Sequence, residues 1–577
     1  MAKKTEPQKE KILSAVSLWK KFDTTLPLNV LQVDEISESG AKAAYAAVEF
    51  DARETEDGRV RVRALFARPA GEGKVPAVLL LCDAEKTPDR ELVDYFVAKG
   101  YAVLAPDYSG KKENCDDSFV TVYPPSLSYA DYKSARGLYR FEKEDTAEKS
   151  CWFEWTYTAL YSLEYLSSRA DISGVGVVGV RLGGEVAWKT MLSPKVKCGV
   201  TVNAAGWLFD GGEEENKGAD PAFKDGRHRY IAGIESQSYA PFIKCPVLML
   251  CACNDYRFDY DKAYDTYARI GGEDEILSAI TYSSDSGSCI GPDGLRDLEL
   301  FLERCLKGRA IYIPSALSVA VKEEGDSLLV TATGDEEGLI EEMGVFYAEA
   351  GENTRSAFRE WLCVHKDRAV KNFTTSCTIT PFSGAQYAHV YAYAKYINGF
   401  YTVSKIASKG LAIKGRGEEK TRVIFSGEAL DTFSVADHEE YSVGGVFLDK
   451  EAVPALKAGY GGILGAYSLG GIKTYKISSP RYVADAEAKL KFDAYSVRSD
   501  KLRVSVDITG EEGYAERYSC ILNVKGGGKW KRTVLNASDF KNERLGKPLK
   551  SFALGSALVF DGVDEENELL VTNVLWL

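Results

Sequence analysis

The chain has 577 residues, more than one hydrophobic core supports, and its length predicts three or four domains. Its formal net charge of −13 argues against nucleic acid or an anionic membrane as a partner. No run of eighteen uncharged apolar residues predicts a membrane span, and the charged N-terminus lacks the apolar core of a signal peptide. We therefore expect a cytoplasmic protein, in which the twelve scattered cysteines are reduced and buried and no metal or cofactor is bound.

The first half of the chain alternates short apolar runs with helical spacings. Runs such as "VPAVLLLC" suit strands that are buried on both faces of a sheet. We expect strands at 59–69, 75–82, 101–108, 175–180, 197–205 and 245–253, and helices at 90–100, 151–169 and 295–308 and after the strand at 175–180. This order predicts a doubly wound, mostly parallel sheet in residues 1–309, with residues 1–58 adding an N-terminal helix and strands. Ligands of such sheets bind beyond the carboxyl ends of the strands.

After residue 308 the helical spacings give way to period-two alternation with turn residues between the runs. Residues 310–415 predict a small β-sandwich of the immunoglobulin or fibronectin type. The basic stretch "KGRGEEKTR" at 414–422 is typical of a linker, and residues 423–577 predict a second sandwich, a jelly roll. The expected fold class is therefore multidomain, with one α/β domain followed by two all-β domains.

The stretch "GVGVVGVRLGGEVAW", residues 174–188, combines an apolar strand, a glycine-flanked corner and the start of a helix. G-x-S-x-G at such a corner is the nucleophile elbow, which presents a serine at the top of the sheet. Here the corner consists of Gly179, Val180, Arg181, Leu182 and Gly183, so arginine stands at the serine position.

Two longer stretches carry a resemblance to a known family. "KVPAVLLLCDAEKTPDRELVDYFVAKGYAVLAPDYSG" and "CPVLMLCACNDYRFDYDKAYDTY" resemble the α/β-hydrolase superfamily, in particular its dienelactone hydrolase and acetyl xylan esterase branch, over about residues 40–308. The resemblance implies an α/β-hydrolase fold and, if the chain is active, hydrolysis of carboxylic esters.

The resemblance places the family's nucleophile at Arg181 and its acid at Asp255. The family's histidine would lie in the loop "SDSGSCIGPDG", where Ser288 or Cys289 stands instead. Its oxyanion loop begins at Cys82 and Asp83, and an acid there would oppose the charge of an oxyanion. A guanidinium stays protonated, so Arg181 serves neither as nucleophile nor as base.

These departures predict a catalytically degenerate hydrolase that acts in binding or assembly, with a carbohydrate-related or small anionic ligand. One alternative is an active carbohydrate esterase with a relocated triad. Another is a purely structural scaffold. The sequence leaves the oligomeric state open.

Arg181 itself has two interpretations. It pairs with the orphaned Asp255, because an unpaired buried carboxylate is costly, or it binds an anion together with the N-terminus of the following helix. The residues expected around a ligand are Arg181, Asp255, Cys82, Asp83, Tyr108 and Trp207.

The stretch "GGGKWKRTVLNASDFK" at 526–541 resembles the galactose-binding-like jelly rolls of carbohydrate-binding modules. In that pattern we expect Trp530, Leu535 and Phe540 in the core. Tyr460, Tyr467, Tyr475 and Tyr482 are the candidates for contact with a sugar.

Overall fold

The structure is a computed structural model, and it describes residues 14–36, 43–71, 73–88, 90–112, 119–134, 147–207, 231–255, 258–283, 289–351, 356–413, 420–427, 430, 434–435, 442–509, 515–562 and 568–577. Contacts divide the chain into two compact units: Met1–Met249 with Asp265–Ser278 and Leu302–Arg309, and Leu250–Tyr264 with Ala279–Phe301 and Ala310–Leu577. None of the helices in these ranges has the length and apolar character that crossing a membrane requires.

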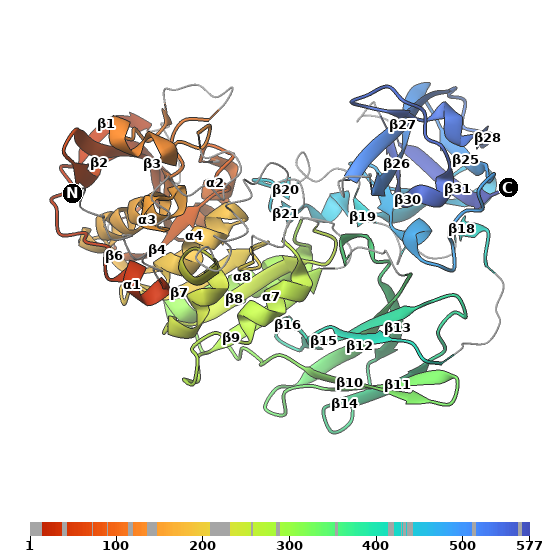
Figure 1. Cartoon of the computed structure of the whole chain (residues 1–577), viewed down its shortest axis with the longest axis horizontal. Helices are drawn as coiled ribbons and strands as arrows, with labels where there is room; N and C mark the ends of the chain where they lie inside the picture. Colours follow the sequence, from red (N-terminus) through yellow and green to blue (C-terminus); the bar gives the residue numbers. More distant parts are fainter. Residues whose placement is uncertain are drawn as a thin grey trace, which may run out of the picture. The chain divides into compact units, whose positions relative to one another are not determined.

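The first half of the chain builds a nine-stranded mixed sheet with the strand order β1-β2-β3-β5-β4-β6-β7-β8-β9 (Figure 1). The strands are β1 (Leu31–Ile36), β2 (Ala43–Thr55), β3 (Gly58–Pro69), β4 (Val75–Leu81), β5 (Ala102–Asp107), β6 (Ile172–Val180), β7 (Val196–Val202), β8 (Val247–Ala252) and β9 (Ser278–Ser283). Strands β5, β4, β6 and β7 pair in parallel, whereas β1, β2, β3 and β5 pair antiparallel. The expectation of an α/β domain is confirmed, but the sheet is mixed rather than mostly parallel, because β1, β2 and β3 join it by antiparallel pairing.

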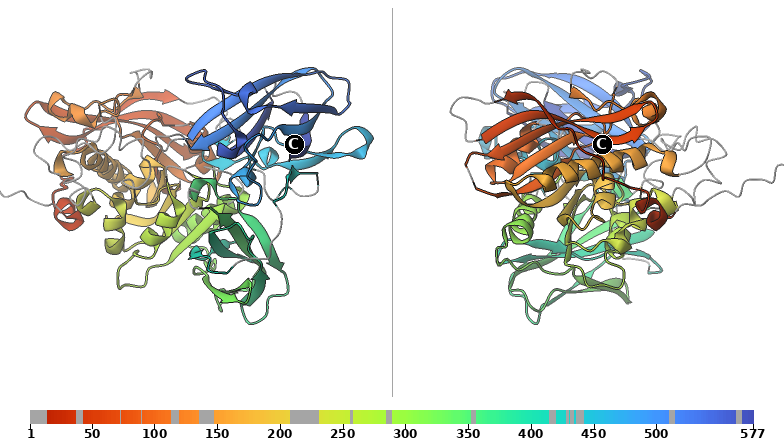
Figure 2. Two further views of the ribbon diagram at one scale, coloured as in Figure 1. Left: turned by 45° about the vertical axis from the view of Figure 1, so that its right-hand side comes forward. Right: turned by 90° about the vertical axis from the view of Figure 1, so that its left-hand side faces the viewer.

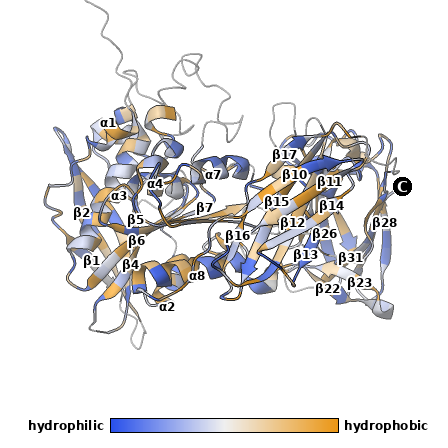
Figure 3. Ribbon diagram, turned by 90° about the horizontal axis from the view of Figure 1, so that it is seen from below, coloured by the Kyte–Doolittle hydropathy of each residue, from blue (hydrophilic) through white to orange (hydrophobic). Residues whose placement is uncertain are grey.

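The central strands are apolar throughout because helices cover both faces of the sheet. Helices α3 (Cys151–Ser168) and α4 (Leu182–Thr190) pack against each other on one side, and α2 (Arg90–Ala98) packs on the other (Figure 3). Most side chains of α3 are buried all around the helix, as expected for a helix enclosed by the protein. Figure 2 shows this long orange helix running along the red and orange strands. Helix α1 (Ala15–Trp19) precedes the first strand, α7 (Tyr260–Tyr267) connects β8 to β9, and α8 (Pro292–Lys307) follows β9.

Residues after 309 form antiparallel sheets, as the alternation predicts. One sheet has the order β10-β11-β14, and the other has the order β13-β12-β15-β16, with β17 also pairing with β15. The strands are β10 (Ser318–Glu324), β11 (Ser327–Thr333), β12 (Ile340–Ala350), β13 (Leu362–Asp367), β14 (Thr374–Ile379), β15 (Tyr387–Tyr396), β16 (Tyr401–Val403) and β17 (Ala407–Gly410). Side chains from both sheets share one apolar cluster, which includes Val330 and Val390. The immunoglobulin-like class of this segment and its boundaries stay predictions.

The last segment holds two six-stranded sheets over one core. The first sheet has the order β22-β23-β31-β25-β28 with β18 beside β31, and the second has the order β19-β24-β30-β26-β27-β29. The strands are β18 (Val423–Phe425), β19 (Ser434–Val435), β22 (Ala455–Ala458), β23 (Leu464–Tyr467), β24 (Ile472–Thr474), β25 (Leu490–Ser496), β26 (Asp500–Thr509), β27 (Ala515–Val524), β28 (Lys531–Leu535), β29 (Lys541–Asn542), β30 (Gly555–Gly562) and β31 (Leu569–Trp576). The jelly-roll class stays a prediction.

The core of the last segment contains Leu535 and Phe540, as expected. The same expectation is wrong for Trp530, which precedes β28 on the surface and is only partly buried. Its indole N–H donates to the Tyr460 carbonyl at 3.1 Å, and its ring lies 5.3 Å from that of Tyr495. Tyr475 is 6% exposed, which removes it from the candidate sugar contacts, whereas Tyr460 is 61% exposed.

Candidate functional site

The glycine-flanked corner has the backbone of a strained strand-to-helix turn. Strand β6 ends at Val180, α4 begins at Leu182, and Arg181 between them has φ 52° and ψ −117°. A bulky L-residue seldom adopts a positive φ, so the surrounding hydrogen bonds must hold this conformation. The Arg181 N–H donates to the Val202 carbonyl at 2.8 Å, and the Arg181 carbonyl accepts from the N–H of Gly184 at 2.9 Å.

The glycines of the corner are required because neighbouring backbone atoms and the Ala204 side chain approach them closely. A Cβ on Gly183 would lie 2.1 Å from the Leu81 carbonyl oxygen at the end of β4. A Cβ on Gly179 would lie 2.5 Å from the Gly183 oxygen, and one on Gly184 would lie 2.4 Å from Ala204 Cβ. Strand β6 therefore turns into α4 with no room for side chains at these three positions, independent of the residue at 181.

Arg181 forms an ion pair with Asp83, whose Oδ2 lies 3.3 Å from Arg181 Nε. Leu81 at the end of β4 pairs in register with Gly179 of β6, which brings the residues after both strands to the same edge of the sheet. The Asp83 side chain is 7% exposed and that of Arg181 is 21% exposed, so the pair is partly shielded from water. The sequence analysis assigned Asp255 as the partner and missed Asp83 in this role. Asp255 belongs to the second unit, so pairing with Arg181 stays a prediction.

Cys82 and Tyr108 fix the turn that carries Asp83. The Tyr108 hydroxyl donates to the Cys82 carbonyl at 2.7 Å, and the Ser109 hydroxyl donates to the Ala84 carbonyl at 2.8 Å. Tyr108 is 2% exposed, and burial together with the nearby Asp83 raises the pKa of its phenol well above the usual value. Its ring packs edge-on against Trp155 at 5.8 Å. Tyr108 is thus built into the support of the corner and presents no open ring face to a ligand.

Trp207, another expected ligand contact, lies after β7 and is half-buried. The guanidinium of Arg269 lies 5.4 Å from the centre of its ring. This stacked cation covers one indole face, so the contact with a ligand that we expected there stays a prediction.

In the second unit, Asp255 is 1% exposed, and one of its carboxylate oxygens accepts from the N–H of Phe258 at 3.1 Å. Ser288 lies outside the described residues. Cys289 packs with Leu448 and Ala452 in a small apolar cluster. The hairpin of β20 (Ser442–Val443) and β21 (Phe447–Leu448) lies beside Ile290. The Ile290 N–H donates to the Val446 carbonyl at 2.9 Å, and the Leu448 N–H donates to the Ile290 carbonyl at 2.8 Å. Cys289 is therefore a packed thiol, and its correspondence to the family's histidine stays a prediction.

The two histidines within the described ranges are already engaged elsewhere in the β segment. His365 hydrogen-bonds the Thr375 hydroxyl at 2.8 Å, and His389 hydrogen-bonds the Ser408 hydroxyl at 2.8 Å. Burial, helped by the charge of Arg359, lowers the pKa of His389 to about 3. His389 is therefore neutral at physiological pH.

Sequence analysis missed a buried charged cluster on α4. Lys189 is 2% exposed, and its ammonium donates to the Glu185 carbonyl and to the Ser236 hydroxyl, each at 3.0 Å. The rings of Trp152 and Tyr239 lie 5.4 and 5.2 Å from the same nitrogen. Burial lowers the pKa of Lys189 to about 8, although the nearby carboxylates of Glu185 and Glu235 oppose this shift. An i,i+4 Glu–Lys spacing is typical of exposed helices, so nothing in the sequence indicated this burial.

No family model matches the chain, and no curated protein matches it. Solved structures similar to it include an acetyl xylan esterase from Paenibacillus sp. R4, with 15% identity, a TM-score of 0.37 and coverage of 51% of this chain and 92% of the other. Acetyl xylan esterase 1 from Thermoanaerobacterium sp. JW/SL YS485 is also similar, with 16% identity, a TM-score of 0.35 and coverage of 47% of this chain and 87% of the other. A 2,6-dihydroxy-pseudo-oxynicotine hydrolase has 17% identity, a TM-score of 0.33 and coverage of 45% and 68%.

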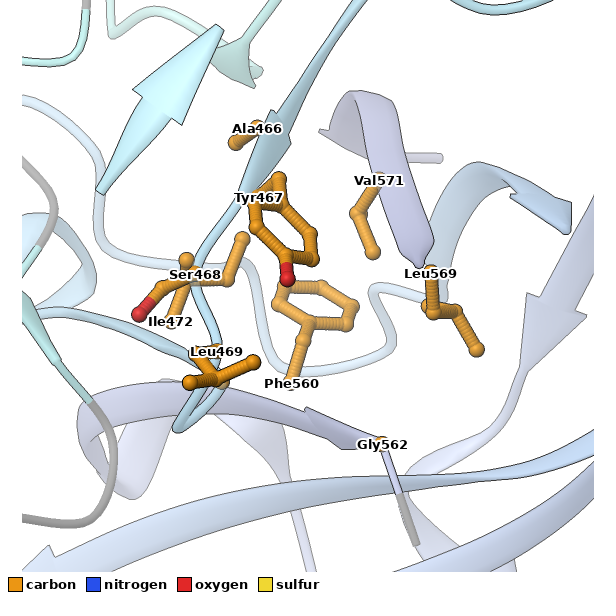
Figure 4. A pocket seen from close by; sticks show the side chains of 10 residues that line it. Ala466, Tyr467, Ser468, Leu469, Ile472, Phe560, Gly562, Leu569 and Val571 are labelled. Atoms are coloured by element: carbon orange, nitrogen blue, oxygen red, sulfur yellow. The ribbon is translucent and has the colours of Figure 1, made fainter. Parts of the chain in front are cut away.

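A pocket between the two sheets of the last segment is too small for a sugar. It has a volume of about 20 Å³ and is lined by residues that include Tyr467, Phe560 and Leu569 (Figure 4). This volume holds about one water molecule. Tyr460 and Trp530 lie on the outer surface of this segment, and the Trp530 indole contacts the Tyr460 backbone.

Proposed function

We propose that the chain is a catalytically degenerate member of the α/β-hydrolase superfamily that binds a small anionic ligand at the Arg181 corner instead of hydrolysing esters. The observation that carries the proposal is Arg181 itself, which occupies the strained position between β6 and α4. A permanently protonated guanidinium at a helix N-terminus attracts a carboxylate, and it has no lone pair for attack on an ester. Asp83, 3.3 Å away, is the internal carboxylate that a ligand would replace.

The anion site has a direct test in the thermal stability of three proteins. Sodium acetate should raise the Tm of the parent protein relative to sodium chloride at equal ionic strength, because a ligand that binds only the folded state stabilises it. Arg181→Ala should remove the part of the acetate-induced rise in Tm that comes from this site. Asp83→Asn should enlarge that rise, because the internal carboxylate no longer competes for the guanidinium. Equal acetate responses in the parent, Arg181→Ala and Asp83→Asn would contradict the proposal and favour a structural scaffold.

The chain should lack esterase activity. Hydrolysis of p-nitrophenyl acetate should not exceed that of heat-denatured protein, and a fluorophosphonate probe should label no serine. Among the described residues of the α/β segment, Ser236 is a candidate nucleophile, because it lies within hydrogen-bond distance of Lys189, whose pKa of about 8 would suit a base. Ser236 and Lys189 are 0% and 2% exposed, which closes them to a substrate. Probe labelling that Ser236→Ala abolishes would establish the relocated-esterase alternative.

A further inference from the structure

A cavity of about 220 Å³ lies inside the second unit, apart from the corner at Arg181. Its wall is built by three stretches of the chain: the end of β9 with the start of α8, the sheet β13-β12-β15-β16, and the segment 448–454. An apolar cavity of about 150 Å³ is enough for one benzene molecule. The space therefore suits a molecule with one six-membered ring and a small substituent.

One wall is an aromatic ladder that depends on a glycine in the middle of β12. Gly344 separates Glu342 from Phe346 on the same face of the strand, and a Cβ on Gly344 would lie 2.3 Å from the ring of Tyr393. The Tyr393 ring occupies this position, 5.6 Å from the Phe346 ring and stacked on the Tyr401 ring at 5.1 Å. Tyr393 is 4% exposed and Phe346 is only partly buried, so Phe346 supplies most of the apolar surface that this wall offers to a ring.

The carboxylates at the cavity already have basic partners. Lys395 Nζ lies 3.2 Å from Asp293 Oδ1, and Arg368 Nε lies 2.8 Å from Glu342 Oε2. The Tyr393 hydroxyl also donates to Glu342, at 2.6 Å. Each acidic lining residue therefore has a basic partner, Lys395 in the lining for Asp293 and the exposed Arg368 outside it for Glu342.

The remaining charge at the cavity is positive. Lys366 on β13 lines it and is exposed. Among the described residues this lysine makes no ion pair within 4 Å, and its charge helps Arg368 to lower the pKa of Glu342. Helix α8, sixteen residues long, also begins here at Pro292, and the preceding Gly291 has no side chain to cap its first turn. The positive end of the helix dipole adds to the charge of Lys366.

We infer that this cavity binds a single-ring organic carboxylate, with the ring against Phe346 and Tyr393 and the carboxylate toward Lys366 and the start of α8. The site is independent of the anion site proposed at Arg181. It differs from that site in selecting for a ring as well as for a negative charge.

The test uses benzoate and its neutral isostere benzamide, titrated into the full-length protein by ligand-observed NMR. Benzoate should bind several-fold more tightly than benzamide. Lys366→Gln should weaken benzoate about threefold to fivefold, as expected for the loss of one partly exposed charge contact, and should leave benzamide unchanged. Lys322→Gln is the matched control: Lys322 is exposed on β10 and pairs with Glu324. This control variant should bind benzoate like the parent.

A second variant removes the space while keeping the charge. Val453 lines the cavity from the segment 448–454, and Val453→Phe should place a ring where the ligand ring lies and abolish benzoate binding. Far-ultraviolet circular dichroism and the Tm establish that the variant folds. If it does not fold, Phe346→Ala is used instead; it removes the ring that the ligand packs against and should weaken benzoate and benzamide alike. Arg181→Ala should retain benzoate binding, which separates this site from the proposed function. Equal affinity for benzoate and benzamide, no effect of Lys366→Gln, or no benzoate binding at 20 mM would each overturn the inference.

Discussion

Replacement of Gly183 by alanine is expected to destabilise the fold by at least about 3 kcal/mol, the upper part of the range for overpacked interiors. The new Cβ would lie 2.1 Å from the Leu81 carbonyl oxygen and 2.3 Å from that of Cys82. Both atoms belong to the backbone at the end of β4, so no side-chain rotation relieves the overlap. Helix α4 or strand β4 has to move, and the whole corner moves with it. Urea unfolding followed by tryptophan fluorescence measures the loss.

The control is Gly174→Ala on strand β6, which leads into the same corner. A Cβ there meets only Lys197 Cγ at 3.4 Å, an ordinary contact with a flexible side chain. This variant should stay within about 1 kcal/mol of the parent, because loss of a glycine mainly restricts the unfolded chain. Equal midpoints for the two variants would show that the corner tolerates a side chain at 183, contrary to the packing described.

Truncation of Lys189 to alanine is expected to cost about 2–5 kcal/mol, because it removes two buried hydrogen bonds of a charged group and leaves a cavity. The ammonium is the cation beside Glu185 and Glu235, which are both 0% exposed. Its removal leaves these carboxylates buried without that charge and opens a cavity between Trp152 and Tyr239. Lys195→Ala is the control, since Lys195 is 45% exposed and pairs with Glu164. It should cost less than about 1 kcal/mol.

The same lysine predicts how stability depends on pH. Its pKa of about 8 in the folded state lies below the ordinary value of 10.5. Between these values the unfolded chain binds more protons than the folded chain, so the free energy of unfolding should rise with pH from about 8 to 10.5. Below pH 8 the cost of holding the charged lysine in the interior is fully present. Other groups titrate in this range, so the measured quantity is the slope of the parent minus that of Lys189→Met. A difference of zero or the opposite sign would contradict the assignment.

Much of the fold could be predicted because its strands are apolar runs bounded by turn residues. The structure has strands at Gly58–Pro69, Val75–Leu81 and Ala102–Asp107, close to the predicted bounds. The glycines around 181 also predicted a close-packed corner, since only backbone crowding explains three of them there.

The partners of individual charges could not be predicted. Asp83 and Arg181 are 98 positions apart in the sequence, and only the parallel register of β4 and β6 brings them together. The burial of Lys189 depends on aromatic side chains from α3 and from the segment before β8, which carry no local signal on α4. Trp530 follows the motif of a core residue but lies on the surface, because Gly459 and Gly465 leave space for its ring against the backbone.

Ile290, just before α8, forms its backbone hydrogen bonds with the hairpin of β20 and β21. The ribosome makes this hairpin much later than Ile290. The Cys289 thiol and the Gly445 carbonyl that it contacts are 156 positions apart. At ordinary rates of translation the later residue emerges roughly 8–30 s after the earlier one. During that interval the Ile290 backbone lacks its native hydrogen bonds, and Cys289 lacks the apolar cover of Leu448 and Ala452. The nascent chain therefore completes this part of the α/β segment only after the last β segment has begun to emerge, which makes the loop a point where a chaperone or a thiol-reactive molecule reaches the unfinished protein.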